Sequence, residues 1–202
     1  MSMTLSPPLA AGEPEIRKHH WTVDEFYQAY DDGLLDNDKR WELLQGRIVE
    51  KMIPGPRHSY FADAIAHELR VVLEPPLLVR EEKSVRLTLD TELIPDVSVV
   101  QGTRDDYRER HPTPIDIVLI VEVADSSVAK DLGEKAQSYS QAGMTEYWVV
   151  LVDEEAIVVH RQPTLDGYQS VLRLTETNSL SPLAMPDITW TINELLGRTE
   201  AQ

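Results

Sequence analysis

Residues 117–127 read IVLIVEVADSS, and residues 93–100 read LIPDVSVV. The first segment is apolar at successive positions, which is the pattern of a central strand that helices cover on both faces. Each segment nevertheless holds a carboxylate, Asp96 in one and Glu122 in the other. A buried carboxylate without a partner costs several kcal/mol or becomes neutral. We therefore expect both acids to meet a cation, a set of hydrogen-bond donors or a metal ion.

The segments around these two strands predict alternating helices and strands. Thr22 and Glu25 have the spacing of a capping box, which starts a short helix, and Gln45-Gly46 is typical of a hairpin turn. Further strands are expected at residues 84–89, 145–152, 156–162 and 167–174, and further helices at residues 56–72, 127–143 and 191–197. This order indicates an α/β (mixed α+β) fold with one mixed sheet and helices against it.

The composition fits one globular domain over residues 21–200 behind a flexible tail over residues 1–20. The chain has no cysteine, which excludes disulfides, thiolate zinc sites and cysteine nucleophiles and fits the reducing cytoplasm. No apolar run approaches the roughly 20 residues of a spanning helix, so no membrane segment is expected. With 19 Lys+Arg against 35 Asp+Glu the net charge is −16, so a phosphate substrate would need local cations.

Strand alternation predicts where the two acids point. Asp96 shares a face with Ser98, and Glu122 shares a face with Ile120 and Ala124. If the two strands are neighbours, both carboxylates can meet on one face of the sheet. Two close carboxylates repel, and they are reconciled by a shared proton or by a divalent cation. Mg²⁺ is commonly held by one or two carboxylates plus waters, so the pair is a sufficient protein contribution.

Lys135, on the helix that follows, is the cation expected near this pair. It lies three residues after Leu132 and four before Tyr139, at the edge of the stripe that faces the core. From there its ammonium can reach the carboxylates. The alternative is that Asp131 and Lys135 form an ordinary ion pair on a solvated helix face, worth about 0.3–0.5 kcal/mol.

Several motifs in this order resemble the Uma group of bacterial endonucleases, in the restriction-endonuclease-like PD-(D/E)XK superfamily. They are WELLQGRIVEKMIPGPRHS (41–59), IPDVSVV (94–100), VLIVEVADSS (118–127), DLGEKAQSYSQAGMTEYWVV (131–150) and VVHRQP (158–163). The resemblance covers about residues 21–196. It implies an αβββαβ core in which Asp96 and Glu122 bind Mg²⁺ or Mn²⁺.

The superfamily pattern expects a lysine two positions after the second acid, where this chain has Ala124. The resemblance implies that Lys135 on the next helix replaces it, and Lys130 is a poorer candidate because it lies nearer the helix start. An acid in the first hairpin of the group matches Glu42. Glu42 either completes the metal shell or pairs across the hairpin with Arg47.

These assignments predict a metal-dependent endonuclease that hydrolyses phosphodiester bonds of DNA. The metal would polarise the phosphodiester and lower the pKa of its water, and Lys135 would orient the attacking hydroxide. His58 matches a histidine common in the group. In this chain it either contacts phosphate or a carboxylate, or caps or packs its loop. It is a candidate substrate contact together with Arg57. The other cations available for a basic rim are Arg80, Lys83, Arg86, Arg104, Arg108 and Arg110.

Two alternative functions stay open at this point. The chain could be an inactive nuclease-fold protein that serves as an interaction or regulatory module, which Ala124 and the acidic charge favour. Ester hydrolysis by Ser126 or Ser127 is a third class, but no Gly-x-Ser-x-Gly elbow surrounds them and they are better placed as helix caps. A homodimer is expected to be possible through a sheet edge such as residues 156–162.

Overall fold

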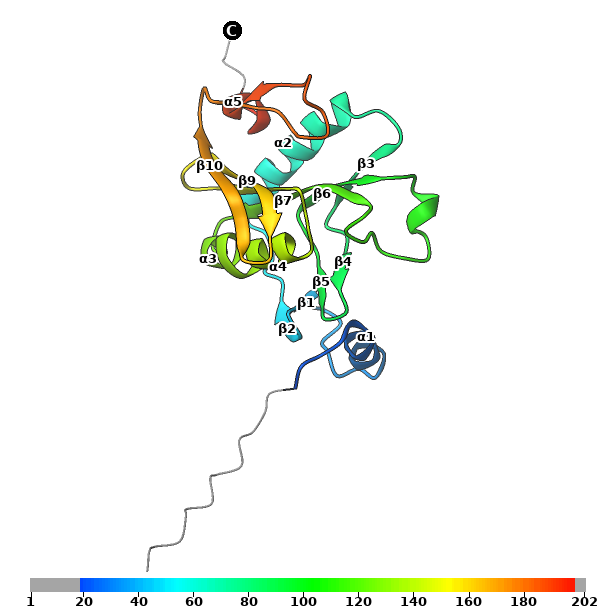
Figure 1. The fold of residues 1–202 in the computed structure, drawn as a ribbon. Helices are drawn as coiled ribbons and strands as arrows, with labels where there is room; N and C mark the ends of the chain where they lie inside the picture. The colour runs from blue at the N-terminus through cyan, green and yellow to red at the C-terminus, as the bar shows by residue number, and fades with distance from the viewer. Residues whose placement is uncertain (1–18, 199–202) are drawn as a thin grey trace, which may run out of the picture.

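A computed structural model describes residues 19–198, and its centre is a six-stranded mixed sheet (Figure 1). In spatial order the strands are β10 (Gly167–Thr175), β9 (Ala156–Thr164), β8 (Glu146–Leu151), β7 (Ile117–Ala124), β6 (Val97–Gln101) and β3 (Leu77–Glu81). Strands β7 and β8 are parallel and the other neighbours are antiparallel. The tail expected over residues 1–20 lies, except for His19 and His20, outside the described residues.

A second, four-stranded antiparallel sheet lies beside the first, so the expectation of one sheet is wrong. Its order is β2 (Arg47–Glu50), β1 (Trp41–Leu44), β5 (Thr91–Leu93) and β4 (Val85–Thr88), and helix α1 (Val23–Asp31) precedes it with the predicted capping box on Thr22. The β1–β2 turn is tight because Gln45 and Gly46 both have positive φ, 49° and 69°. This turn fixes which side chains of β1 face the larger sheet.

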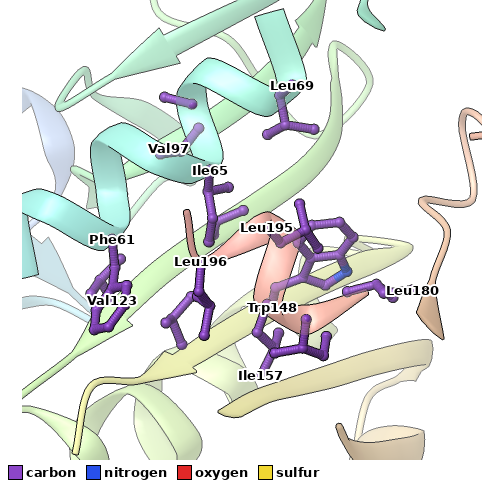
Figure 2. Packing of buried hydrophobic residues seen from close by; sticks show 14 of the residues in the cluster. Phe61, Ile65, Leu69, Val97, Val123, Trp148, Ile157, Leu180, Leu195 and Leu196 are labelled. Carbon is purple, nitrogen blue, oxygen red and sulfur yellow. The ribbon is translucent and has the colours of Figure 1, made fainter. Parts of the chain in front are cut away.

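Helices cover both faces of the six-stranded sheet, as the apolar sequence of β7 predicts (Figure 1). Helix α2 (Pro56–Val72) and the short α5 (Ile192–Leu195) pack on one face, where Phe61 and Ile65 contact a core that includes Trp148 (Figure 2). The two-stranded sheet of β11 (Ser179–Leu180) and β12 (Trp190–Thr191) closes that side.

The opposite face is covered by α3 (Val128–Lys130), a π-helical turn η2 (Asp131–Lys135) and α4 (Ala136–Gln141). Tyr139 of α4 packs there with Ile120 and Ala124 of β7 and with Leu44 of the smaller sheet. The smaller sheet and the α3–α4 segment thus meet over one face of β7. This is the face toward which Glu122 alternates.

Strand β9 is not an edge strand, which corrects the dimer edge suggested at residues 156–162. A hairpin returns the chain as β10, and the register runs from Gly167↔Thr164 to Thr175↔Ala156. The backbone groups of β9 are therefore paired on both sides, and the open edges of the six-stranded sheet are β10 and β3.

Candidate active site

The two acids meet where β6 begins and β7 ends. Asp96 immediately precedes β6, whose first residue Val97 pairs with Val121 of the antiparallel β7. Oδ2 of Asp96 accepts a hydrogen bond of 2.7 Å from the backbone N–H of Val123. Glu122 lies between Val121 and Val123 on β7, directly across from Asp96. Both carboxylates line one pocket of about 270 Å³. The converging geometry that the sequence predicted is present.

Asp96 is buried, with 2% of its surface exposed, and is held by a lysine and a histidine. Nζ of Lys51 lies 2.8 Å from Oδ1, and Nε2 of His58 lies 3.1 Å from Oδ2. Burial alone would raise the pKa of Asp96, but the hydrogen bond from His58 and the charge of Lys51 hold it well below its usual range. Asp96 is therefore a carboxylate at neutral pH.

Glu122 is buried in a less favourable setting. Its Oε1 accepts hydrogen bonds of 2.8 Å from Nζ of Lys135 and from the hydroxyl of Tyr139. Within residues 19–198 no donor pairs with the other oxygen, Oε2. Burial raises the pKa of Glu122 to about 7, against the charge of Lys135, and the nearby charge of Asp96 adds to the shift. Glu122 can thus exchange a proton near neutral pH.

Removing the Tyr139 hydroxyl by Tyr139→Phe should shift the titration of Glu122 further upward, because the carboxylate form loses a donor. We expect the titration midpoint of Glu122 to lie above about 7 and the free energy of unfolding to fall by about 1–2 kcal/mol. Carboxyl NMR of the protein and urea unfolding measure the two effects. Tyr60→Phe is the control, since its hydroxyl contacts only the carbonyl of Gly197 at the surface. An unchanged Glu122 midpoint would contradict this assignment.

Lys135 reaches the acids because the helix is locally widened. The π-helical turn η2 directs both Asp131 and Lys135 inward, with 2% and 4% of their surfaces exposed, and leaves Leu132 exposed. The alternative of a solvated Asp131–Lys135 pair is therefore wrong, and so is the placement of Leu132 in the core stripe. Nζ of Lys135 lies 2.8 Å from Glu122, 3.3 Å from Glu42 and 3.7 Å from Asp131. Burial alone would lower the pKa of Lys135, but these three carboxylates together raise it, so Lys135 stays charged.

Glu42, on β1, belongs to this cluster and is not the partner of Arg47. It is 1% exposed and accepts a hydrogen bond from the backbone N–H of Ile94 at 2.9 Å. Lys130 lies 3.2 Å from its other oxygen. Burial opposes ionisation, but the charges of Lys135, Lys130 and Lys51 outweigh it and lower the pKa of Glu42. Arg47 instead pairs with Glu134 at 2.7 Å on the surface.

Sequence reasoning missed two members of the cluster, Lys51 and the buried Asp131. Lys51 follows β2, and only the docking of the hairpin onto the larger sheet brings it to Asp96. The spacing of Asp131 and Lys135 was visible, but it is equally typical of a surface pair. Burial raises the pKa of Asp131, against the charge of Lys135. The single ammonium of Lys135 thus lies within 4 Å of three carboxyl groups.

The remaining candidates lie at the margin of the pocket or outside it. Arg57 is not in the pocket, since it pairs with Asp153 at 2.7 Å and donates to the carbonyl of Val152. Ser127 precedes α3, but its hydroxyl donates to Asp131 and does not cap the helix backbone. In the part of the chain that the structure describes, no histidine hydrogen-bonds Ser126 or Ser127, so the serine-hydrolase alternative has no activated nucleophile.

The oxygen donors of the pocket suit Mg²⁺ or Mn²⁺. Oε2 of Glu122 has no donor in the described region and can bind a metal directly. Asp96 is ionised, and its Oδ1, whose only donor in that region is Lys51, could be shared with a metal. Between residues 19 and 198 no group of three or more acidic, histidine or cysteine side chains converges as a metal cage. The protein would contribute the pair alone, which Mg²⁺ accepts because it keeps several of its waters.

The same fold occurs in a solved structure described as "a putative nuclease belonging to DUF820 from Anabaena variabilis". The TM-score is 0.70 at 20% sequence identity, over 88% of this chain and 98% of that chain. The chain therefore shares the fold of that structure, a mixed sheet with helices on both faces. The Uma2 family, described as "Putative restriction endonuclease", matches residues 23–194, and the chain belongs to this family. No curated protein matches the chain.

Proposed function

We propose that the protein is a metal-dependent endonuclease that hydrolyses phosphodiester bonds of DNA. The observation that carries the proposal is the meeting of Asp96 and Glu122 in one pocket under the ammonium of Lys135. The family and the fold support a nuclease. Mg²⁺ or Mn²⁺ between the two acids would polarise the phosphodiester and make its attacking water more acidic.

The other side chains of the pocket would stabilise the transition state or hold the reacting groups in position. The ammonium of Lys135 is fixed by Glu122 and Glu42, and it offsets negative charge that develops on the phosphate in the transition state. Glu42 holds Lys135 and Lys130 in place, and serves the site as a positioning residue. His58 and Lys51 keep Asp96 ionised and oriented by contacts of 3.1 Å and 2.8 Å.

Metal binding can be measured without any nucleic acid. Mn²⁺ at 100 times its dissociation constant should stabilise the folded protein by about 2.7 kcal/mol, which for a chain of this size raises Tm by about 5–10 °C. Asp96→Asn should abolish this shift. Asp105→Asn, an exposed acid in the loop after β6, is the control and should keep it. An equal shift in all three proteins would place the ion elsewhere.

The same measurements separate the enzyme from an inactive nuclease-fold module. The enzyme requires the Asp96-dependent Mn²⁺ shift together with cleavage of duplex DNA in the presence of the ion. A module that only binds partners need not bind the ion and would not cleave DNA. Cleavage that persists in EDTA would contradict the metal-dependent mechanism.

The sequence also predicts a cytoplasmic location and a possible homodimer. No helix in the described part of the chain is long and apolar enough to cross a membrane. We propose a cytoplasmic protein, and a homodimer that would use one of the open sheet edges, β10 or β3, in place of β9. Light scattering after size-exclusion chromatography measures the oligomeric state, and a monomer at micromolar concentration would contradict the dimer.

A further inference from the structure

Most of the lysines and arginines between residues 19 and 198 lie within 4.0 Å of a carboxylate oxygen. Within residues 19–198, only Arg80, Lys83 and Arg104 have no carboxylate oxygen within 4.0 Å of their charged nitrogens. The other arginines near them are occupied, since Arg86 pairs with Glu92 at 2.9 Å and Arg110 pairs with Asp116 at 2.6 Å. Unpaired cations in a chain of net charge −16 need an explanation.

All three unpaired cations line one hollow of about 490 Å³, which we call the basic hollow. It lies along the open edge of the six-stranded sheet, where β3 is flanked by the loop that carries the short helix η1 (Asp105–Tyr107) (Figure 1). The ring of Tyr107 forms part of its wall, and the guanidinium of Arg80 lies 5.1 Å from the centre of that ring. The stacking holds Arg80 without neutralising it.

Arg80 is incompletely satisfied in this position. Its Nη1 is buried and has no hydrogen-bond partner within the described residues. A guanidinium has five donors in a planar fork, which matches the oxygens of a phosphate group. An anion in the basic hollow would supply the missing negative charge and would accept hydrogen bonds from the other guanidinium nitrogens, which also have no partner within the described residues.

Arg80 points to the face of the sheet that holds the candidate active site, whereas Val79 and Arg70 line the hollow from the other face, so the hollow wraps around the open edge at β3. Arg80 pairs with Ser98 across β3 and β6, and Ser98 pairs with Ile120 of β7, so all three side chains point to one face. Ile120 and Glu122 are two residues apart on that strand and contact the same Tyr139 layer. Along β6, Ser98 is about 7 Å from Asp96 at a strand rise of roughly 3.3 Å per residue.

We propose that the basic hollow binds the phosphate backbone of the DNA substrate beside the cleavage site. This inference rests on the proposed nuclease function. It identifies the surface that would attract DNA although the chain has a net charge of −16. Duplex DNA carries one charge per roughly 1.7 Å of its axis, so a duplex at the active site presents further phosphates within the reach of the hollow. Lys83, Arg104 and Arg80 then position the substrate without reading its sequence.

The test is binding of a fluorescently labelled DNA duplex in EDTA, measured by anisotropy over a range of salt concentrations. The variant Lys83→Glu/Arg104→Glu changes two exposed cations of the hollow and leaves Arg80 in place. The control Arg173→Glu/Arg198→Glu makes the same change of net charge at cations that are about equally exposed, at 50% each, and pair with Glu154 and Glu155. Circular dichroism checks that each variant is folded.

We expect the hollow variant to bind duplex at least about tenfold more weakly, and its salt dependence to fall by about one unit of log–log slope for each lost phosphate contact. The control should stay within about twofold of the unchanged protein. Equal losses in both variants, no loss in the hollow variant, or no duplex binding by the unchanged protein would each overturn the proposal. Equal competition by poly-glutamate would also overturn it, since the hollow would then bind acidic chains in general.

Binding and cleavage are separate readouts of this experiment. Duplex binding that depends on the hollow, without any cleavage in Mg²⁺ or Mn²⁺, would support the hollow and contradict the proposed enzyme. Cleavage that is unaffected by the hollow variant at low substrate concentration would support the enzyme and contradict the hollow.

Discussion

Asp96→Asn should reduce Mg²⁺- or Mn²⁺-dependent DNA cleavage by at least about 10³-fold, a loss of roughly 4 kcal/mol of transition-state stabilisation. The substitution keeps the shape of the side chain and an oxygen for the Val123 N–H, but removes the charge that a hard cation requires. It also leaves Lys51, which is 9% exposed, without its closest acidic partner. The measurement is the rate of nicking or linearisation of plasmid DNA by purified protein.

The control for this prediction is Asp63→Asn, which removes the same charge at an exposed position of α2 and should leave the rate unchanged. Metal-dependent cleavage by Asp96→Asn at the original rate would place the catalytic centre outside this pocket. A loss of activity with a Tm far below that of the unchanged protein would be a folding effect. The Tm of each variant without metal is therefore measured beside its rate.

Lys135→Met should be the most destabilising change in the cluster and should also impair cleavage. Removing one partner of a buried charge pair typically costs about 3–5 kcal/mol, because an uncompensated charge stays behind. Here Glu42 and Glu122 would both lose their central ammonium. We expect a fall in Tm of about 10 °C and a fall in cleavage rate of about 10²–10³-fold.

The stability cost of Lys135→Met should depend on pH, with a sign that follows from Glu122. Its pKa is already raised to about 7 by burial, and it should rise further without the ammonium. A raised pKa means that the folded protein binds a proton more readily than the unfolded chain, so this contribution to stability is present at low pH and lost as pH rises. Urea unfolding should therefore show a smaller cost below pH 7 than above it.

Lys130→Met is the matched control, because Lys130 contacts the same Glu42 from a position that is 30% exposed. We expect a cost of no more than about 1 kcal/mol for it. Equal costs for the two lysines, at every pH, would show that Lys135 is not the central cation of the cluster.

The strand pattern was enough to predict the meeting of the acids. Alternation has a period of two residues, so it places Asp96 and Glu122 on one face once their strands are neighbours. The apolar sequence of β7 likewise predicted helices on both sides of the sheet. These parts of the site depend on local geometry that a sequence specifies directly.

The rest of the cluster depends on tertiary contacts that periodicity does not contain. Lys51 reaches Asp96 only because the small sheet docks against the large one, and the prediction of a single sheet concealed that contact. The unpaired state of Arg80 could not be predicted either, because it depends on which cations of the loop after β6 find acids. For Leu132 the wrong placement came from assuming a regular helix.

The widened turn at Asp131–Lys135 makes the length of this segment as important as its composition. A regular helix turns by about 100° per residue. Deletion of a single residue here would therefore rotate Lys135 relative to Asp131 and away from the strand carboxylates, although the rest of the sequence is unchanged. A deletion at Gly133, a position with open space around it, would be more damaging than most replacements there. The position of the Lys135 ammonium is therefore set by the π-helical geometry of this turn, which a helix pattern with a fixed residue spacing does not predict.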